Sequence, residues 1–382
     1  MPHPINNYVV KVHSRCNLDC SYCYEYNRGN TGWKTKPREM TINVFRKMCS
    51  RIREHAIKHD LKSVSLSLHG GEPLLRKPSF FKEAAQIVKE IISPICECNL
   101  GVQTNAVLLS SEYLDVFLAN EIRVGVSLDG PSEVNDKYRT YKSGRGSYKR
   151  ARSGIEKLLE APYYEIWGGV LAVIDVNSDP VLVYQHLAAL SPPTIDFLEP
   201  DGSWDRLPDG KNHPDTTEYG DWLIAVFDEW FSGNQNVKLR KFEEIIQRLL
   251  GGHGDMEYFG LEPVSLLVVA TDGSYESVDQ IKSVKDGIER TGLDVFNNEI
   301  DDVLELDLIR ARQLGLDGIS SKCVECEFST SCGGGYFPHR YSESNQFINP
   351  SIYCADYYKL FSHIKNVLIK DVGIELRSKG IA

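Results

Sequence analysis

The alternation of β-rich and helical segments limits the possible folds of this chain more than any other feature. Short β-rich runs lie at residues 8–13, 64–69, 100–104, 122–128, 166–174 and 195–198. The segments between these runs repeat apolar residues at helical spacing. Strands that alternate with helices form parallel sheets through right-handed crossovers. We therefore predict an α/β fold in which six units make an open, partial (β/α)6 barrel rather than a closed barrel of eight.

A loop rich in Gly, Pro and Asp begins at residue 201, with the sequence DGSWDRLPDGKNHPD. We take this loop as a domain boundary. Two amphipathic helices follow it, and residues 265–270 and 274–278 predict a hairpin with an Asp-Gly turn. A cysteine-rich stretch and a closing helix complete the chain. We predict three parts: a partial barrel at 1–200, a bridging helical region at 201–260, and an α+β domain with a C-terminal helix at 261–382.

Charge and hydrophobicity exclude several classes of function. The chain has 43 Lys and Arg against 53 Asp and Glu, a net charge of −10, which disfavours binding to nucleic acid. No segment approaches the roughly 18 consecutive apolar residues that span a bilayer, and the N-terminus shows no signal peptide. We expect a cytoplasmic protein with neither a membrane nor a nucleic-acid partner.

Three of the ten cysteines, Cys16, Cys20 and Cys23, directly follow the first predicted strand. A reducing compartment does not keep disulfides, so clustered thiols there indicate metal or iron–sulfur ligands. Three thiolates can hold three irons of a [4Fe–4S] cluster and leave the fourth iron open to another ligand. The alternatives are a zinc site or a chance group of buried cysteines. Zinc sites are normally closed by four ligands, and only His13 lies nearby as a fourth.

A second motif, Gly70-Gly71-Glu72-Pro73, follows the second predicted strand. It would therefore lie at the C-terminal edge of the barrel, where active sites of such barrels form. Glycines let the backbone approach a ligand closely, and a carboxylate can hold a cationic amine. Taken alone, this tetrapeptide is most often just a turn.

Together these motifs resemble the radical S-adenosylmethionine (radical SAM) superfamily. The resemblance implies that the three cysteines hold the catalytic [4Fe–4S] cluster and that S-adenosylmethionine binds its open iron. It also implies a set of cofactor-binding residues: Gly70, Gly71, Glu72 and Pro73 for the amino group, Ser127 for another contact, Arg139 for the carboxylate, and, more weakly, Gln103 for the wall of the site. The alternative for Arg139 is a solvent-exposed ion pair with Asp136.

The cysteines near the C-terminus, Cys323, Cys326, Cys332 and Cys354, are similar to the SPASM extension of radical enzymes that modify peptides. In the full pattern, seven cysteines hold two auxiliary clusters. Here Tyr336 and Val278 stand at two of the missing positions. The resemblance thus implies one auxiliary [4Fe–4S] cluster with four thiolate ligands. A structural zinc site with the same four thiolates is the alternative.

Asp279 is the candidate catalytic residue. In the sulfatase maturases that this chain resembles, an aspartate follows the cysteine whose place Val278 takes here, and it acts as a base. A carboxylate beside a substrate that is being oxidised could accept the released proton. The alternative is a surface aspartate at the end of a hairpin.

The phrases KVHSRCNLDCSYCYEY, CGGGYFPHRY and NPSIYCADYY most resemble maturases that form cyclophane rings in ribosomally made peptides. This implies a carbon–carbon bond between an aromatic ring and a nearby β-carbon of a precursor peptide, with an external one-electron reductant of the flavodoxin or ferredoxin type. Oxidation of Ser or Cys to formylglycine by an anaerobic sulfatase maturase is one alternative, and a non-catalytic metal-binding regulatory protein is another. Only about a dozen residues precede Cys16, so we expect no N-terminal leader-binding domain. The helices around Trp222 and Trp230, the C-terminal domain, or another protein would recognise the leader.

Overall fold

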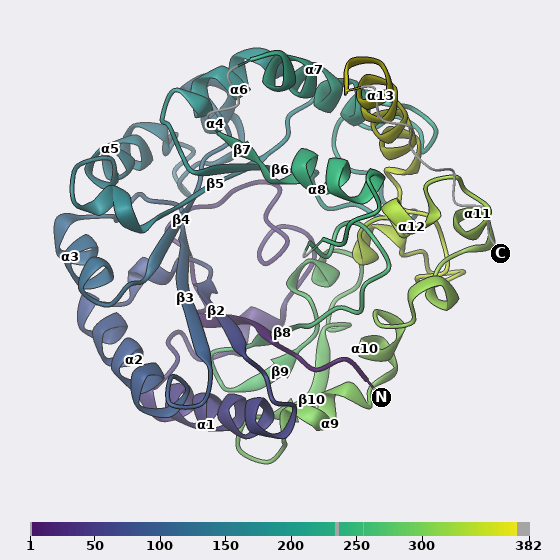
Figure 1. Cartoon of the computed structure of the whole chain (residues 1–382). Helices are drawn as coiled ribbons and strands as arrows, with labels where there is room; N and C mark the ends of the chain where they lie inside the picture. The colour runs from purple at the N-terminus through teal and green to yellow at the C-terminus, as the bar shows by residue number, and fades with distance from the viewer. Residues whose placement is uncertain (1, 234–236, 255, 373–382) are drawn as a thin grey trace.

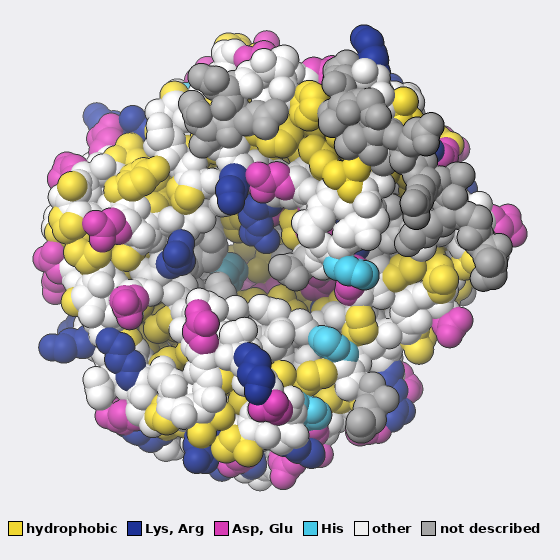
Figure 2. All heavy atoms as spheres, viewed as in Figure 1, with side chains coloured by type: hydrophobic (Ala, Val, Ile, Leu, Met, Phe, Trp, Pro, Cys, Tyr) yellow, Lys and Arg dark blue, Asp and Glu magenta, His cyan; other side chains and the backbone are white. Residues whose placement is uncertain are grey.

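One ten-stranded sheet curves through the protein and carries helices on its outer side (Figure 1). The computed structural model describes residues 2–233, 237–254 and 256–372. The strand order is β10-β9-β8-β1-β2-β3-β4-β5-β6-β7. In the space-filling view, the middle of the face turned to the viewer is hollowed, and charged side chains lie around the hollow (Figure 2).

The first six strands form the parallel part of this sheet. They are β1 (Asn7–His13), β2 (Ser63–Gly70), β3 (Glu97–Thr104), β4 (Arg123–Ser127), β5 (Trp167–Val173) and β6 (Thr194–Leu198). Each is hydrogen-bonded in parallel to the next, and the short β7 (Lys238–Leu239) extends the row beyond β6. The predicted α/β fold with six parallel strands is confirmed.

Helices connect these strands and cover their outer side (Figure 1). They are α1 (Ile42–Lys58), α2 (Pro78–Ile91), α3 (Ser111–Ala119), α4 (Ser132–Tyr138), α5 (Tyr148–Leu158) and α6 (Pro180–Ala188). Two of them begin at clear sequence signals. The Thr41 side chain accepts a hydrogen bond from the Val44 backbone at the start of α1. At α6, Asp179 caps the helix and Pro180 takes its first position, where a missing N–H costs nothing.

The second half of the chain continues the same sheet. Its elements are α7 (Glu218–Ser232), α8 (Arg240–Leu249), β8 (Leu266–Val269), β9 (Ser274–Glu276), η4 (Asp279–Ser283), β10 (Arg290–Asp294), α9 (Ile300–Leu304), α10 (Asp307–Ala311), α11 (Ser321–Val324), α12 (Ser329–Cys332) and α13 (Cys354–Val372). The predicted hairpin is present as β8 and β9, and β8 pairs in parallel with β1. Helix α13 packs against α7 (Figure 1). The barrel and residues 266–294 therefore share one sheet, while the three predicted domain limits stay predictions.

The two tryptophans of α7 are part of the core. Trp222 and Trp230 are only 3% and 4% exposed. Trp222 packs edge-on against Phe197 of β6, and the Trp230 indole N–H donates to the carbonyl of Val237. Both rings are covered and so offer no surface to a leader peptide, while recognition of a leader by other parts of these helices, by the C-terminal domain or by another protein stays a prediction. In the described part of the chain, no helix has the length and apolarity needed to cross a membrane.

Candidate active site

A cleft of about 210 Å³ lies at the C-terminal ends of the parallel strands. It brings together most of the residues singled out in the sequence: Cys16, Cys20, Cys23, Gly70, Gly71, Glu72, Gln103, Ser127 and Arg139. Pro73 and Asp279 are not among its described lining residues. Pro73 is instead buried in the first turn of a short 3-10 helix (Pro73–Leu75), where its fixed φ suits the turn.

The loop after β1 holds the first three cysteines. The Cys23 backbone N–H donates to the carbonyl of Cys20, and the Leu18 N–H points at the sulfur of Cys16 from 3.4 Å. Burial raises the pKa of the Cys16 thiol and brings that of Cys23 to about 12. A thiol with such a pKa stays protonated at neutral pH unless a metal displaces the proton. The three side chains thus fit a metal centre at the rim of the cleft.

The second motif lies against this cysteine loop. The Gly71 N–H donates to the carbonyl of His13 at 2.9 Å, and the Glu72 N–H donates to that of Arg15 at 3.0 Å. A Cβ on Gly71 would collide with the Arg15 carbonyl and the Tyr26 hydroxyl. Gly70 has φ +131°, and its Cβ would collide with the His13 carbonyl. The glycines are therefore required for the cysteine loop to lie directly on the end of β2.

Glu72 is buried and holds the strand ends together. Its Oε1 accepts hydrogen bonds from the Leu74 N–H at 2.9 Å and the Thr104 hydroxyl at 2.7 Å, and its Oε2 accepts one from the Asn105 N–H at 2.9 Å. Burial raises the pKa of this carboxyl against the effect of the three donors. The sequence had suggested Glu72 as a cofactor contact, but nothing local indicated that it also joins the ends of β2 and β3.

Arg139 is buried at the cleft and belongs to a three-residue chain. Its Nη1 donates to the Tyr22 hydroxyl at 2.8 Å, and that hydroxyl donates to Asp129 Oδ2 at 2.6 Å. The alternative of a solvent-exposed pair with Asp136 is wrong, because Asp136 caps the backbone N–H of Tyr148 instead.

Two further polar candidates meet in the cleft. The Gln103 side-chain amide donates to the Ser127 hydroxyl at 2.9 Å, across neighbouring strands β3 and β4. Both side chains line the cleft, so the structure brings together these two sequence candidates from different strands.

Asp279 begins η4 and is 4% exposed. Its Oδ1 lies 2.7 Å from Lys11 Nζ and 3.2 Å from Lys282 Nζ, and its Oδ2 lies 3.5 Å from the Tyr24 hydroxyl. Burial alone would raise the pKa of this carboxyl, but the two ammonium groups outweigh it and hold the pKa well below its usual range. The alternative of a surface aspartate is wrong, since the side chain is enclosed.

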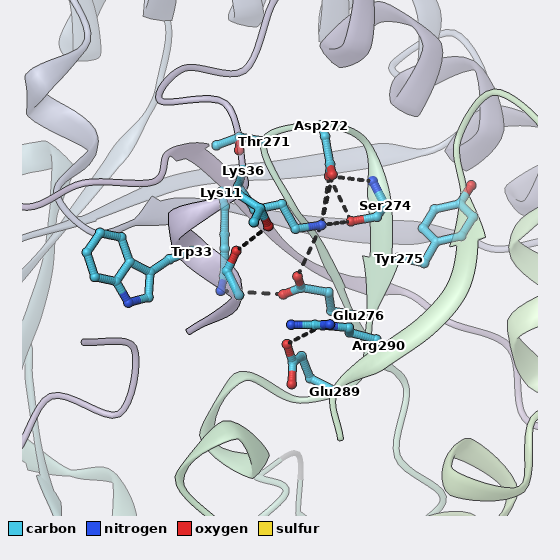
Figure 3. Close-up of polar contacts among 12 residues, drawn as sticks. Lys11, Trp33, Lys36, Thr271, Asp272, Ser274, Tyr275, Glu276, Glu289 and Arg290 are labelled. Atoms are coloured by element: carbon cyan, nitrogen blue, oxygen red, sulfur yellow. Dashed lines mark hydrogen bonds and ion pairs between the residues drawn. The ribbon is translucent and has the colours of Figure 1, made fainter. Parts of the chain in front are cut away.

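Asp279 is one member of a larger buried group of charges. Lys11 also pairs with Glu25 at 2.7 Å, and Lys282 pairs with Glu276 at 2.7 Å. Figure 3 shows the outer part of this network, where Lys36 reaches between the hairpin residue Asp272 and Glu276. Sequence analysis missed this network, because it joins residues 11–36 to residues 272–282, more than 200 residues later in the chain.

The four C-terminal cysteines meet at a second cavity of about 910 Å³. It is lined by Cys323, Cys326, Cys332 and Cys354 together with apolar side chains. Burial and the neighbouring thiols raise the pKa of Cys332 to about 12. The three glycines 333–335 all have positive φ, and Arg340 donates to the carbonyl of Gly333 at 2.7 Å. A Cβ at Gly333 would collide with the carbonyl of Gly260, so the turn after Cys332 can pack this closely only with glycine there.

The spread of both cysteine sets favours a cluster over a single zinc ion. Tetrahedral zinc with Zn–S bonds near 2.3 Å brings its sulfurs within roughly 4 Å of one another. Among the described residues, only His55, His59 and Asp301 bring three potential ligand atoms within 4.8 Å of one another. Neither cysteine set is this tight, and a four-iron cluster needs the wider spacing.

The place of a further auxiliary cluster is filled with side chains. Val278 and Tyr336, which stand at two missing ligand positions, are both buried in one apolar cluster. Tyr336 stacks on Tyr258 with ring centroids 4.4 Å apart, and its hydroxyl donates to Gln280 at 2.8 Å. The described part of the chain therefore offers thiolate sets for two clusters, one at each site.

Residues 10–184 match the model of the Radical SAM superfamily. The serine-type anaerobic sulfatase-maturating enzyme of Bacteroides thetaiotaomicron is 25% identical over 94% of this chain and 89% of its own length. The cysteine-type anaerobic sulfatase-maturating enzyme of Clostridium novyi is also 25% identical, over 94% of each chain. Both similarities extend through the barrel and the C-terminal cysteines.

Solved structures share the fold. The structure described as native anSMEcpe with bound AdoMet has a TM-score of 0.80 at 21% identity and covers 96% of this chain and 99% of its own. Streptococcus suis SuiB bound to precursor peptide SuiA has a TM-score of 0.59 at 14% identity, over 91% of this chain and 76% of its own. At these identities the likeness concerns the fold alone.

Proposed function

We propose that this chain is a radical SAM enzyme and that it oxidises a serine or cysteine side chain of a peptide or protein, in the manner of anaerobic sulfatase maturases. The observation that carries the proposal is the similarity to two sulfatase-maturating enzymes over 94% of the chain. This similarity supports the alternative from the sequence more than the formation of a cyclophane. A non-catalytic regulatory protein is disfavoured, because the three-cysteine loop and the glycine motif meet in one cleft.

The cleft fits a [4Fe–4S] cluster together with S-adenosylmethionine. A structure with the same fold contains bound AdoMet. When bound and reduced, this pair supplies a 5′-deoxyadenosyl radical that removes a hydrogen atom from a C–H bond. Cys16, Cys20 and Cys23 would hold the cluster, and the main chain at Gly70 and Gly71 would lie against the cofactor. The four C-terminal cysteines would hold one auxiliary cluster, and an external one-electron reductant would supply the electron.

The side chains of this protein would orient the cofactor and shape the site. Arg139 lies at the cleft with its charge balanced by Asp129 through Tyr22, so it can face a carboxylate without a large desolvation cost. Gln103 and Ser127 offer a hydrogen-bonded pair on the neighbouring strands β3 and β4. Asp279 would act as the base, and its ion pairs with Lys11 and Lys282 keep its carboxylate ionised.

A carbon–carbon crosslink in a ribosomally made precursor peptide is the second candidate. Val278 and Tyr336 favour this candidate. They stand in place of two cysteines of the seven-cysteine pattern, and their side chains are buried in one apolar cluster. A neighbouring structure is also bound to a precursor peptide. In this case the substrate would lose two hydrogens and gain a ring.

Mass spectrometry of a peptide product separates the two candidates. The anaerobically reconstituted enzyme is incubated with S-adenosylmethionine, dithionite and the Kp18Cys peptide that a neighbouring structure contains. Oxidation gives an aldehyde that reacts with a hydrazide, and this result supports the proposal. Formation of 5′-deoxyadenosine without a hydrazide-reactive peptide, together with a crosslink in a peptide encoded beside the gene, would favour the cyclophane. If 5′-deoxyadenosine forms neither with the Kp18Cys peptide nor with the peptide encoded beside the gene, both candidate functions are contradicted.

A further inference from the structure

A basic segment, residues 28–38, follows the cysteine loop of this acidic chain. The segment contains Arg28, Lys34, Lys36 and Arg38 and no acidic residue, whereas the whole chain has a net charge of −10. Arg28 and Lys36 form ion pairs with other parts of the protein. Lys34 and Arg38 are exposed, and neither forms an ion pair with any described residue. The segment therefore presents two cations that the protein itself does not pair.

The acidic side chains beside the basic segment already have partners. Asp272 pairs with Lys36, Glu39 pairs with Arg76, Glu289 pairs with Arg290, and Asp286 accepts hydrogen bonds from the backbone N–H and the hydroxyl of Thr31. The charges of Lys34 and Arg38 therefore remain available to a partner from solution.

Trp33 lies in the middle of the basic segment and is partly buried. Arg15, the residue directly before Cys16, donates from Nη1 to the Trp33 carbonyl at 2.7 Å, and its guanidinium carbon lies 5.0 Å from the centroid of the indole ring. The Lys34 Nζ lies 5.8 Å from the same centroid. Figure 3 shows that the Trp33 ring points away from the ion network around Lys36. The indole is thus flanked by two cations at the surface.

Trp33 also connects this surface to the cysteine loop. Its ring packs edge-on against Tyr26, with the two ring centroids 5.1 Å apart. Tyr26 lines the cleft together with Cys16 and Cys23. Burial raises the pKa of the Tyr26 hydroxyl, and these two cysteines raise it further, as expected for a phenol beside thiolates. Two packed aromatic rings therefore lead from the basic segment to the cysteines that would hold the catalytic cluster.

These features suit the docking of an electron carrier. Interfaces between electron-transfer proteins are small, and opposite charges steer their formation. Trp and Arg contribute most to binding where they lie at the centre of an interface. The transfer of an electron slows steeply with distance, so a carrier must dock near the cluster that it reduces. The basic segment meets all of these requirements for a carrier of negative charge.

We propose that the basic segment, with Trp33 at its centre and Arg15 beside it, is the docking surface for a small acidic one-electron carrier protein of the flavodoxin or ferredoxin type. This inference rests on the proposed function, which requires such a reductant. The carrier loses one electron, the N-terminal cluster gains it, and no bond forms or breaks. Trp33 and Tyr26 fill the space between the two redox centres and keep their own electrons.

Binding tests this surface without turnover. Calorimetric titration of the reconstituted enzyme with an oxidised flavodoxin gives Kd at low ionic strength. We expect the double variant Lys34→Glu, Arg38→Glu to raise Kd about tenfold or more and to weaken its dependence on salt. The control is Lys82→Glu, Lys89→Glu on the exposed side of α2, which changes the net charge equally. An equal Kd in the two double variants would overturn the proposal.

Turnover distinguishes docking from catalysis. Dithionite reduces the cluster without a docking surface, so Lys34→Glu, Arg38→Glu should retain its iron and form 5′-deoxyadenosine at the wild-type rate. With a reduced flavodoxin or ferredoxin held below Kd, the rate of the variant should fall about tenfold or more. An unchanged rate with both carriers would overturn the proposal.

Lys322→Glu tests the competing position, because Lys322 lines the cavity of the C-terminal cysteines and is exposed. We expect this variant to keep the wild-type rate with both carriers. A loss in Lys322→Glu but not in the double variant would place docking at that cavity and overturn the proposal. A wild type that works with dithionite but with neither carrier would overturn it as well. A wild type that forms no 5′-deoxyadenosine with dithionite would instead contradict the proposed function.

Discussion

Gly71 is the residue at which the glycine motif, residues 70–73, contacts the cysteine loop. Its N–H bonds the carbonyl of His13, and it leaves no room for a side chain below the Arg15 carbonyl. We expect Gly71→Ala to push the loop outward and lower the iron bound by the N-terminal set, from about four to well below two per chain. Iron analysis of a background in which Cys323 and Cys326 are alanine measures this set alone.

Gly101→Ala is the matched control for this prediction. Gly101 lies on β3 of the same sheet, and its Cβ would meet only the Arg123 carbonyl at an ordinary 3.5 Å. Iron content should therefore stay at the wild-type level. Equal iron in both variants would show that the close contact at Gly71 does not hold the loop.

His55 provides a pH-dependent contact near the N-terminus. Its Nε2 accepts the Ile5 N–H at 3.1 Å, and its Nδ1 donates to Asp301 at 3.0 Å. Burial lowers the pKa of His55 despite Asp301. The unfolded chain therefore takes up a proton near pH 6.5 that the folded chain does not, so this residue reduces stability as pH falls below that value. The same neutral state, with a proton on Nδ1 and an accepted bond at Nε2, argues against a metal at His55.

We expect His55→Gln to make the fall in stability between pH 7 and pH 5 shallower. One fully linked proton changes the free energy of unfolding by about 1.4 kcal/mol per pH unit, which bounds the effect. Urea unfolding at both pH values measures it. His253→Gln is the control, because His253 is 91% exposed and should leave the slope unchanged.

At this scale, local motifs could be predicted and distant partners could not. Cys16 and Gly70 stand in short motifs that follow two neighbouring predicted strands, so their meeting at one cleft could be expected from strand order, whereas Arg139 was placed there only by the family resemblance. The lysine partners of Asp279 come from β1 and from one turn later in η4. No spacing in the sequence indicates that Lys11 meets residue 279, and the low pKa of Asp279 depends on that meeting.

Among the elements, α13 matters because it begins at Cys354, a proposed ligand of the auxiliary cluster. Asp356 in its first turn accepts hydrogen bonds from Lys211 at 2.6 Å and from the Gly220 N–H at 2.8 Å. Both members of the ion pair are fully buried. Lys211 also donates to the carbonyl of Thr216. This pair fixes α13 to the start of α7 and thereby places one ligand of the auxiliary site.

Lys211→Met should destabilise the protein by about 3–5 kcal/mol, because it leaves the Asp356 carboxylate buried without its counter-ion. Urea unfolding measures the loss. Lys62→Met is the control, since Lys62 and its partner Asp60 are more than 80% exposed and such pairs contribute at most about 1 kcal/mol. A similar loss of stability in Lys211→Met and Lys62→Met would show that burial does not strengthen the effect of losing the ion pair.

The strands were predictable because they are apolar and regularly spaced, whereas their ends and the packing of helices were not. The second hairpin strand was predicted to end at Val278 but ends at Glu276, because η4 begins at Asp279 and takes the chain into the ion network. The amphipathic pattern of α7 gave a helix correctly. It could not show that α13, more than 120 residues later, covers that helix.

At the scale of the whole molecule, β8 joins the second half of the chain to β1 in one sheet. Removal of residues 265–382 would leave the β1 edge unpaired and the side of α7 that faces α13 uncovered. Exposed strand edges and apolar faces cause aggregation. We expect residues 1–264 to be insoluble where the full chain is soluble, and centrifugation of lysates measures this. A soluble, folded fragment would support the predicted division into separate domains.

The number of clusters also follows from the whole molecule. The N-terminal loop and the four C-terminal cysteines provide two thiolate sets, while Val278 and the stacked pair Tyr258 and Tyr336 occupy the remaining site. We expect about eight irons per reconstituted chain, and about four after Cys323 and Cys326 are both replaced by alanine. The double variant Val278→Cys, Tyr336→Cys restores only two of the three thiolates missing from the seven-cysteine pattern, so it should not gain iron. Twelve irons in the wild type would contradict the filled site, and four irons with zinc would favour a structural zinc ion at the C-terminal cysteines.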